Sequence, residues 1–144
     1  MKAIIKQVDG ITFIGKADSN HWVSIDGPEK FQGLNAGCRP KEMLLIALGG
    51  CTGSDVISIL SKKRISLDHL EIKLEGDVVD EHPKIFSKIH IEYMFYGNDL
   101  TKKDLEIAID LSQNKYCPIS AMLQKSCEIT YSYEIISLKS NSKG

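Results

Sequence analysis

Four cysteines are the residues of this chain with the most distinctive chemistry: Cys38, Cys51, Cys117 and Cys127. None of them forms a Cys-x-x-Cys pair, so a zinc site of standard spacing is not expected. The four histidines are scattered along the chain and indicate no metal cluster. We therefore expect packing or redox roles for the thiols and no metal site of standard spacing.

Cys117 comes directly before Pro118, and proline is favoured at the first position of a helix. This order predicts that Cys117 is the N-cap of a short helix, with its sulfur facing the free N–H groups of Ile119 and Ser120. The helix dipole favours a thiolate at such a position, and Lys115 adds positive charge nearby. The alternative is that Cys117 only caps a turn, and the residues alone leave both interpretations open.

Cys51 lies in the middle of a predicted long helix, where the backbone amides are already bonded to the helix itself. A cysteine in such a place is most often a small buried hydrophobe. Gly49, Gly50 and Gly53 argue for a special role, because each costs about 1 kcal/mol in a helix interior relative to alanine. We expect these glycines to clear space around the sulfur and to allow another backbone to approach closely.

Charged residues flank Cys51 on the same helix. A guanidinium from Arg39 would stabilise a Cys51 thiolate, and Glu42 could hold that guanidinium in place. Positions 42 and 51 are nine residues apart, about two and a half turns, and point to opposite faces. Arg39 would therefore have to reach the Cys51 of a neighbouring subunit, or Glu42 would have to pair with an arginine elsewhere. Asp55, one turn beyond Cys51, would oppose the thiolate if it were ionised and close.

The two remaining cysteines have plainer contexts. Cys127 lies on the inward face of a predicted strand, and we interpret it as a packing residue. Cys38 lies in a loop beside Arg39 and is either an exposed spare thiol, which we favour, or a second resolving partner.

The helix that carries Cys51 is predicted to run from Pro40 to near Arg64. It is apolar nearly all round, which predicts burial on most sides. Its uninterrupted apolar part is too short to span a membrane. So long and apolar a helix in so small a chain suggests that a partner subunit covers part of the core.

The other elements follow from alternating apolar residues and turn signals. Asp9-Gly10 and Ser19-Asn20 are expected to be turns. Residues 27–39 are either a loop that borders a site or a plain connection. Expected strands are 3–8, 11–17, 21–26, 70–75, 85–95 and 127–136, and expected helices follow Thr101 and span 118–124. The order βββ-α-ββ-α-α-β predicts a mixed α+β fold.

The second strand of the predicted long hairpin is the most strongly patterned of these elements. Its inward face is expected to consist of Ile85, Ile89, Ile91, Tyr93 and Phe95, which alternate with more polar residues.

Length and charge limit the possible functions. The 144 residues predict one domain over 1–138, followed by a polar tail over 139–144. A net charge of −1 argues against partnership with nucleic acid or an anionic membrane. Lys6 and Asp9 interrupt the N-terminal stretch where a signal peptide needs its apolar core, so we expect a cytoplasmic protein.

The combination of segments resembles one known family. RPKEMLLIALGGCTGSDVISIL over residues 39–60, a following β hairpin and YCPIS over residues 116–120 together resemble the OsmC/Ohr family. The resemblance covers almost the whole chain. It implies an OsmC-like fold, in which an intertwined homodimer encloses two central helices between antiparallel sheets.

The same resemblance implies an activity and roles for four residues. It implies a thiol peroxidase that reduces organic hydroperoxides without haem, metal or flavin. Cys51 matches the family's peroxidatic cysteine and Cys117 its resolving cysteine, and a dithiol such as a lipoyl group would reduce their disulfide. Glu42 matches a glutamate that pairs with an arginine, for which Arg39 is the upstream candidate.

Two other functions remain as alternatives. The glycine-lined, apolar surroundings of Cys51 suit a dimer that holds a small apolar or electrophilic ligand without efficient peroxidase turnover. The cysteine pair would also suit a redox sensor that recruits another protein.

Overall fold

The computed structural model describes residues 1–137, and residues 138–144, which include the tail expected over 139–144, lie outside the described part. The chain divides into two compact units, residues 1–46 and the residues from 47 onward. The order of strands and α-helices is the predicted βββ-α-ββ-α-α-β, so the α+β class is confirmed.

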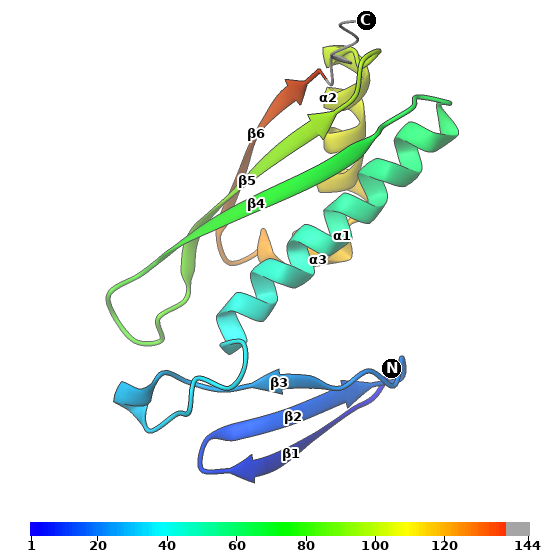
Figure 1. Cartoon of the computed structure of the whole chain (residues 1–144). Coiled ribbons are helices and arrows are strands. Elements are labelled where there is room, and N and C mark those ends of the chain that lie inside the picture. Colours follow the sequence, from blue (N-terminus) through cyan, green and yellow to red (C-terminus); the bar gives the residue numbers. More distant parts are fainter. Residues whose placement is uncertain (138–144) are drawn as a thin grey trace, which may run out of the picture. The chain divides into compact units, whose positions relative to one another are not determined.

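The N-terminal unit contains a three-stranded antiparallel sheet of β1 (Ala3–Asp9), β2 (Thr12–Ala17) and β3 (Val23–Ile25) (Figure 1). Both expected turns are present. Gly10 has a φ of +51°, which suits glycine in a tight hairpin, and the Asn20 N–H donates to the Ala17 carbonyl.

The segment that follows β3 is ordered around the buried carboxylate of Asp26. That carboxylate accepts hydrogen bonds from the N–H groups of Gly27, Leu34 and Ala36 and from the Thr12 hydroxyl. Burial by itself would raise the pKa of Asp26, but these four bonds hold it below its ordinary value. Residues 27–39 are therefore a fixed loop, with a short 3₁₀ turn at Glu29–Phe31, that leads directly into α1.

Helix α1 (Pro40–Lys62) begins at the predicted proline, and its buried stripe follows helical spacing through Leu48, Thr52, Val56 and Leu60. The expected burial on most sides is not met within one chain. On its other sides lie Leu44, Ile46 and Ile57, with exposed fractions of 44%, 60% and 51%. The uninterrupted apolar run is too short to span a membrane, but the whole of α1 is long and apolar enough to do so. Core helices of soluble proteins meet the same criteria, so this is weak evidence for a membrane span.

The glycines of α1 were predicted to allow close approach of another backbone, and the structure shows different contacts. A Cβ at Gly49 would lie 2.8 Å from a Leu74 methyl, and one at Gly53 would lie 3.0 Å from an Ile72 methyl. These two glycines admit side chains of strand β4, not another backbone. Gly50 has nothing within 4 Å of its Cβ position in the single chain.

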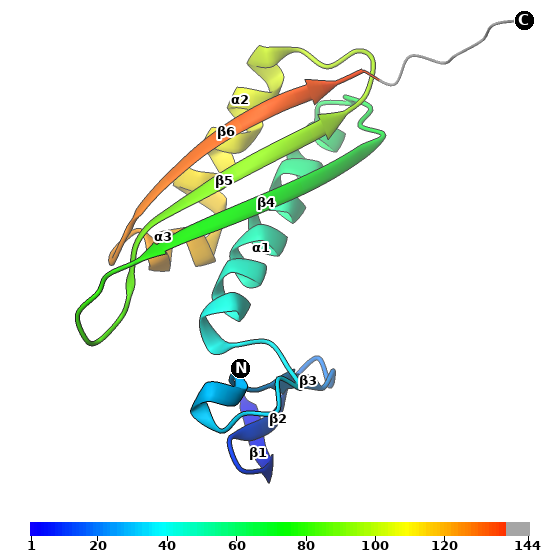
Figure 2. The ribbon, with the colours of Figure 1, turned by 60° about the vertical axis from the view of Figure 1, so that its left-hand side comes forward.

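The C-terminal unit is built on a sheet of β4 (His69–Val78), β5 (Phe86–Tyr96) and β6 (Glu128–Ile136). The predicted long antiparallel hairpin of β4 and β5 is confirmed, and β6 pairs with β5 in parallel. The helices of this unit lie on one face of the sheet (Figures 1 and 2). The central strand β5 provides much of the core, including Ile89, Ile91, Tyr93 and Phe95.

The inward position predicted for Ile85 is wrong. Ile85 lies outside β5 and is 48% exposed, whereas Phe86 is buried. The pairing of Asp77 with Lys88 and of Val78 with Phe86 leaves Ser87 as an extra residue, which is a β-bulge. The bulge shifts the alternation by one position, so Phe86 faces inward in place of Ile85.

Helix α2 (Lys102–Leu111) begins as predicted at Thr101, whose hydroxyl accepts a hydrogen bond from the Asp104 N–H. A single π-helical turn (Ser112–Tyr116) continues it, and α3 (Pro118–Leu123) follows. The sequence does not predict the π turn. It carries Ser112 and Gln113 into the interior of the unit.

Candidate active site

The fold brings Cys51 of α1 and Cys117 of the turn before α3 together. Their Sγ atoms lie 2.8 Å apart, and both are free thiols. A disulfide bond is about 2.05 Å long. The two sulfurs are therefore within a small side-chain movement of bonding distance, although 66 residues separate them along the chain.

Cys117 is the N-cap that the sequence predicts. Its backbone is extended, and its Sγ accepts a hydrogen bond from the Ser120 N–H at 3.3 Å. The adjacent Ile119 N–H acts on Cys51, where it lowers the thiol pKa. The start of α3 thus donates an N–H to each sulfur. Lys115 lies with its ammonium 5.2 Å from the centre of the Tyr116 ring, in a cation–π contact.

Cys51 is a poor thiolate within one chain. The pKa of its thiol is raised to about 11, chiefly by burial, with smaller contributions from the contact with Cys117 and the charge of Asp55. The Asp55 carboxylate and the two sulfurs all lie within 4.8 Å of one another, so Asp55 is as close as its predicted opposition to the thiolate requires.

The same three groups are the types that bind thiophilic metal ions. Two thiolates on one tetrahedral zinc, each about 2.3 Å from the metal, lie about 3.8 Å apart. The Cys51 and Cys117 sulfurs are closer than that, at 2.8 Å. Their spacing therefore suits a disulfide better than shared coordination with Asp55.

A buried hydrogen-bond network lies beside the cysteine pair, and the sequence patterns did not predict it. Thr52 Oγ1 lies 2.6 Å from Tyr93 Oη and 2.8 Å from Ser112 Oγ. Gln113 Nε2 donates to Thr52 and Tyr93, and its Oε1 accepts from Ser120. A signal was present in the sequence, because Thr52 occupies an i+4 position of the buried stripe of α1 and Tyr93 lies on the apolar face of β5.

Arg39 and Glu42 form a pair at the start of α1, in the N-terminal unit. Arg39 Nη1 lies 3.1 Å from Glu42 Oε1, and Glu42 Oε2 accepts from the Arg39 N–H at 2.9 Å. The second arm of the guanidinium donates to Asn35 Oδ1. The Arg39 N–H is the largest cause of the lowered pKa of Glu42, and the guanidinium charge adds to it. Arg39 is thus oriented by a carboxylate, as the sequence predicts.

The other two cysteines lie apart from this chemistry. Cys38 is exposed, and its backbone pairs with Ile25 beside β3. Cys127 is buried, its thiol donates to the Leu123 carbonyl, and burial raises its pKa. Its burial agrees with the prediction, but it precedes β6, which begins at Glu128, and so it is not part of the predicted strand.

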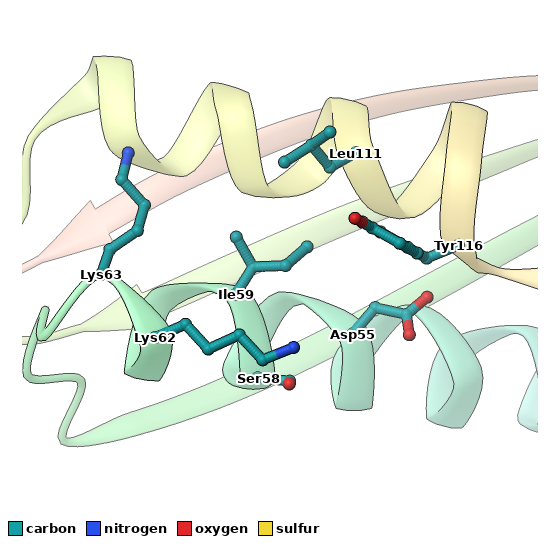
Figure 3. A pocket seen from close by; sticks show the side chains of 7 residues that line it. All are labelled: Asp55, Ser58, Ile59, Lys62, Lys63, Leu111 and Tyr116. Carbon is teal, nitrogen blue, oxygen red and sulfur yellow. The ribbon is translucent and has the colours of Figure 1, made fainter.

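A cavity of about 300 Å³ opens between α1 and the α2–π turn segment (Figure 3). Asp55 lies at one end, and Ile59, Leu111 and Tyr116 form apolar walls. Its polar lining is completed by Ser58, Lys62 and Lys63. Because the Asp55 carboxylate is within 4.8 Å of both sulfurs, this cavity adjoins the cysteine pair.

Comparison with known proteins agrees with this fold. The family described as OsmC-like protein matches residues 33–132, so the chain belongs to the OsmC-like family. It is 39% identical over 139 residues to Protein YhfA of Escherichia coli K12, covering 94% of this chain and 98% of that protein. The resemblance found in the sequence is therefore confirmed.

Solved structures show the same fold. A hypothetical protein from Aquifex aeolicus is 32% identical, with a TM-score of 0.83 over 94% of this chain and 96% of that one. The organic hydroperoxide resistance protein OhrB of Bacillus subtilis is 13% identical, with a TM-score of 0.68 over 93% and 98%. At that identity the likeness to OhrB shows the fold alone.

Proposed function

We propose that this protein is a thiol-dependent peroxidase that reduces small organic hydroperoxides, with Cys51 as the attacking and Cys117 as the resolving cysteine. The observation that carries the proposal is the 2.8 Å separation of the two sulfurs at the start of α3. Membership of the OsmC-like family supports it, since solved structures of this fold include organic hydroperoxide resistance proteins.

The proposed reaction has three steps. The Cys51 thiolate attacks the terminal oxygen of the hydroperoxide, the O–O bond breaks, and the alkoxide takes up a proton and leaves as an alcohol. Cys117 then attacks the sulfenic sulfur of Cys51, which forms the disulfide and releases water. A small dithiol, such as a lipoyl group, reduces the disulfide by exchange and becomes a disulfide itself.

The first step requires a lower Cys51 pKa than the single chain provides. We propose a homodimer in which the Arg39 guanidinium of one chain, held by Glu42, acts on Cys51 of the other chain. An opposite charge within about 4–6 Å lowers the pKa of an ionisable group by about 1–3 units. The exposed side chains of Leu44, Ile46 and Ile57 on α1 support such a dimer, because a second chain would cover them.

A thiol count tests the peroxidase proposal. The fully reduced protein receives one equivalent of cumene hydroperoxide, and thiols and intact mass are measured before and after. We expect the loss of two thiols and a Cys51–Cys117 disulfide in the peptide digest. Cys38→Ser, which removes an exposed thiol, is the matched control and should behave like the wild type. Four unchanged thiols, or full peroxide consumption by Cys51→Ser, would contradict the proposal.

The cavity supports a second candidate function. Its apolar walls and its position beside the cysteine pair suit a small apolar or electrophilic ligand that is bound without turnover. If the four thiols survive the hydroperoxide, alkylation of Cys51 by a small apolar electrophile becomes the test. Replacement of Ile59 by a charged residue should then slow alkylation, and an unchanged rate would count against binding in this cavity.

A further inference from the structure

A hydrogen-bond network of buried side chains lies beside the two cysteines. Its five members are Thr52, Tyr93, Ser112, Gln113 and Ser120, and all of them are buried. Within the described part of the chain, every buried side-chain nitrogen and oxygen has a hydrogen-bond partner. A fully satisfied buried network rigidifies and specifies one arrangement of the segments that carry it.

Gln113 is the residue that joins the two sides of this network. Its Nε2 donates to Thr52 Oγ1 at 2.9 Å and to Tyr93 Oη at 3.0 Å, and its Oε1 accepts from Ser120 Oγ at 2.8 Å. Thr52 follows Cys51 on α1, and Ser120 is the residue of α3 whose N–H bonds to the Cys117 sulfur. One amide group therefore links the segments of both cysteines.

Ser112 forms a second link in parallel with the first. Its hydroxyl lies 2.8 Å from Thr52 Oγ1 and donates to Asp55 Oδ2 at 3.1 Å, so it binds α1 at two points. Its carbonyl accepts the Cys117 N–H at 2.9 Å, which closes the π turn. Such a turn inserts one residue into a helix and is frequent at functional sites. Here it directs Ser112 and Gln113 inward together.

We propose that Gln113 is a positioning residue that holds the Cys117 sulfur close to the Cys51 sulfur and so sets the stability of their disulfide. Its role in resolving a sulfenic acid rests on the proposed peroxidase function, whereas its effect on the disulfide itself does not. In disulfide formation, the Cys117 sulfur forms the S–S bond as the S–O bond of the Cys51 sulfenic acid breaks. The oxygen leaves with the thiol proton as water. A pre-aligned Cys117 makes this step independent of any loop rearrangement.

The test is an equilibrium measurement that needs no peroxide. Wild type and Gln113→Met, which keeps a similar volume and removes the amide, are equilibrated in glutathione buffers of graded redox ratio. The fraction of Cys51–Cys117 disulfide is then counted by mass. The change removes three hydrogen bonds that link the two cysteine segments. If the disulfide form depends on them more than the dithiol form does by the worth of one such bond, the equilibrium constant changes about tenfold. We expect the variant's disulfide to be about tenfold easier to reduce, a shift of about 30 mV.

The matched control is Ile109→Val, which alters a buried α2 residue outside the network. It should leave the glutathione equilibrium unchanged, although it also lowers stability. If Gln113→Met folds and its equilibrium equals that of the wild type, or if Ile109→Val shifts it equally, the proposal is overturned.

If Gln113→Met does not fold, the same glutathione equilibrium measured for Ser120→Ala tests the proposal. This change removes only the hydroxyl that donates to Gln113 and keeps the backbone N–H that bonds to Cys117. We expect a smaller shift in the same direction, and no shift would overturn the proposal. If the variants shift the glutathione equilibrium but the wild-type thiols do not react with hydroperoxide, the positioning role stands and the peroxidase function is refuted.

Discussion

The two units of the chain are stabilised in different ways. Every buried hydrophobic residue of the described chain belongs to the C-terminal unit, where Tyr93 and Phe95 are among the largest. The N-terminal unit instead buries polar groups, chiefly Asp26 and Thr12, while all seven residues of β1 are exposed. The first unit is held by local hydrogen bonds and the second by a packed core.

This difference indicates what each unit contributes. The C-terminal unit contains both cysteines and the network that aligns them, so its part of the site is complete within one chain. The N-terminal unit presents an apolar groove of about 330 Å³, lined in part by Ile5, Val23 and Ile25. Uncovered apolar surface of this kind is typical of a protein interface. We therefore expect a second copy of the chain to cover the N-terminal unit.

The largest expected effect comes from a charge in that groove. Ile5→Glu places a carboxylate among apolar residues, and we expect it to weaken a homodimer about 100-fold, or about 2.7 kcal/mol. Sedimentation equilibrium measures the dissociation constant. Ile4→Glu adds the same charge on the opposite face of β1 and is the matched control. A monomeric wild type, or equal weakening by both variants, would refute the groove as the covered surface.

An intermediate effect is expected at Arg39, through which the N-terminal unit of one chain would act on the cysteines of the other. In Arg39→Met the pKa of Cys51 should stay near the value of about 11 found within one chain. In the wild-type dimer it should lie about 1–3 units lower. The pH dependence of Cys51 alkylation, followed by peptide mass, measures both values.

Arg39→Lys is the control for that experiment. It keeps the positive charge but lacks the forked guanidinium that pairs with Glu42. The Cys51 pKa of this variant should therefore lie between those of the wild type and Arg39→Met. Identical alkylation profiles for wild type and Arg39→Met would show that Arg39 does not act on Cys51.

The smallest effect is expected at Asp26 and concerns stability at low pH. Its folded-state pKa lies below the unfolded value of about 3.9, so its stabilisation is fully present above that pH. The stabilisation is lost as the pH falls through the folded-state value. Between about pH 4 and pH 2 the wild type should therefore lose more stability than Asp26→Asn, as measured by urea midpoints. Asp18→Asn, at an exposed carboxylate of the same unit, should change this pH dependence little.

The sequence by itself determined the features that depend on near neighbours. Pro40 and the pair Cys117-Pro118 begin their helices as predicted, because helix starts are set by free N–H groups and the fixed φ of proline. The β4–β5 hairpin follows from alternation along the chain. Cys117 was a candidate from its context at the start of a helix, whereas the role of Cys51 followed from the family resemblance and not from its mid-helix context.

The tertiary structure alone decided the features that join distant residues. The 2.8 Å approach of Cys51 and Cys117, the fit of Leu74 at Gly49 and the network around Gln113 each connect separate elements. A bulge at Ser87, one residue long, brings Phe86 into the inward position that was predicted for Ile85. Local patterns indicate which side chains face inward. Which residues contact one another is set by strand register and helix packing, which depend on the whole fold.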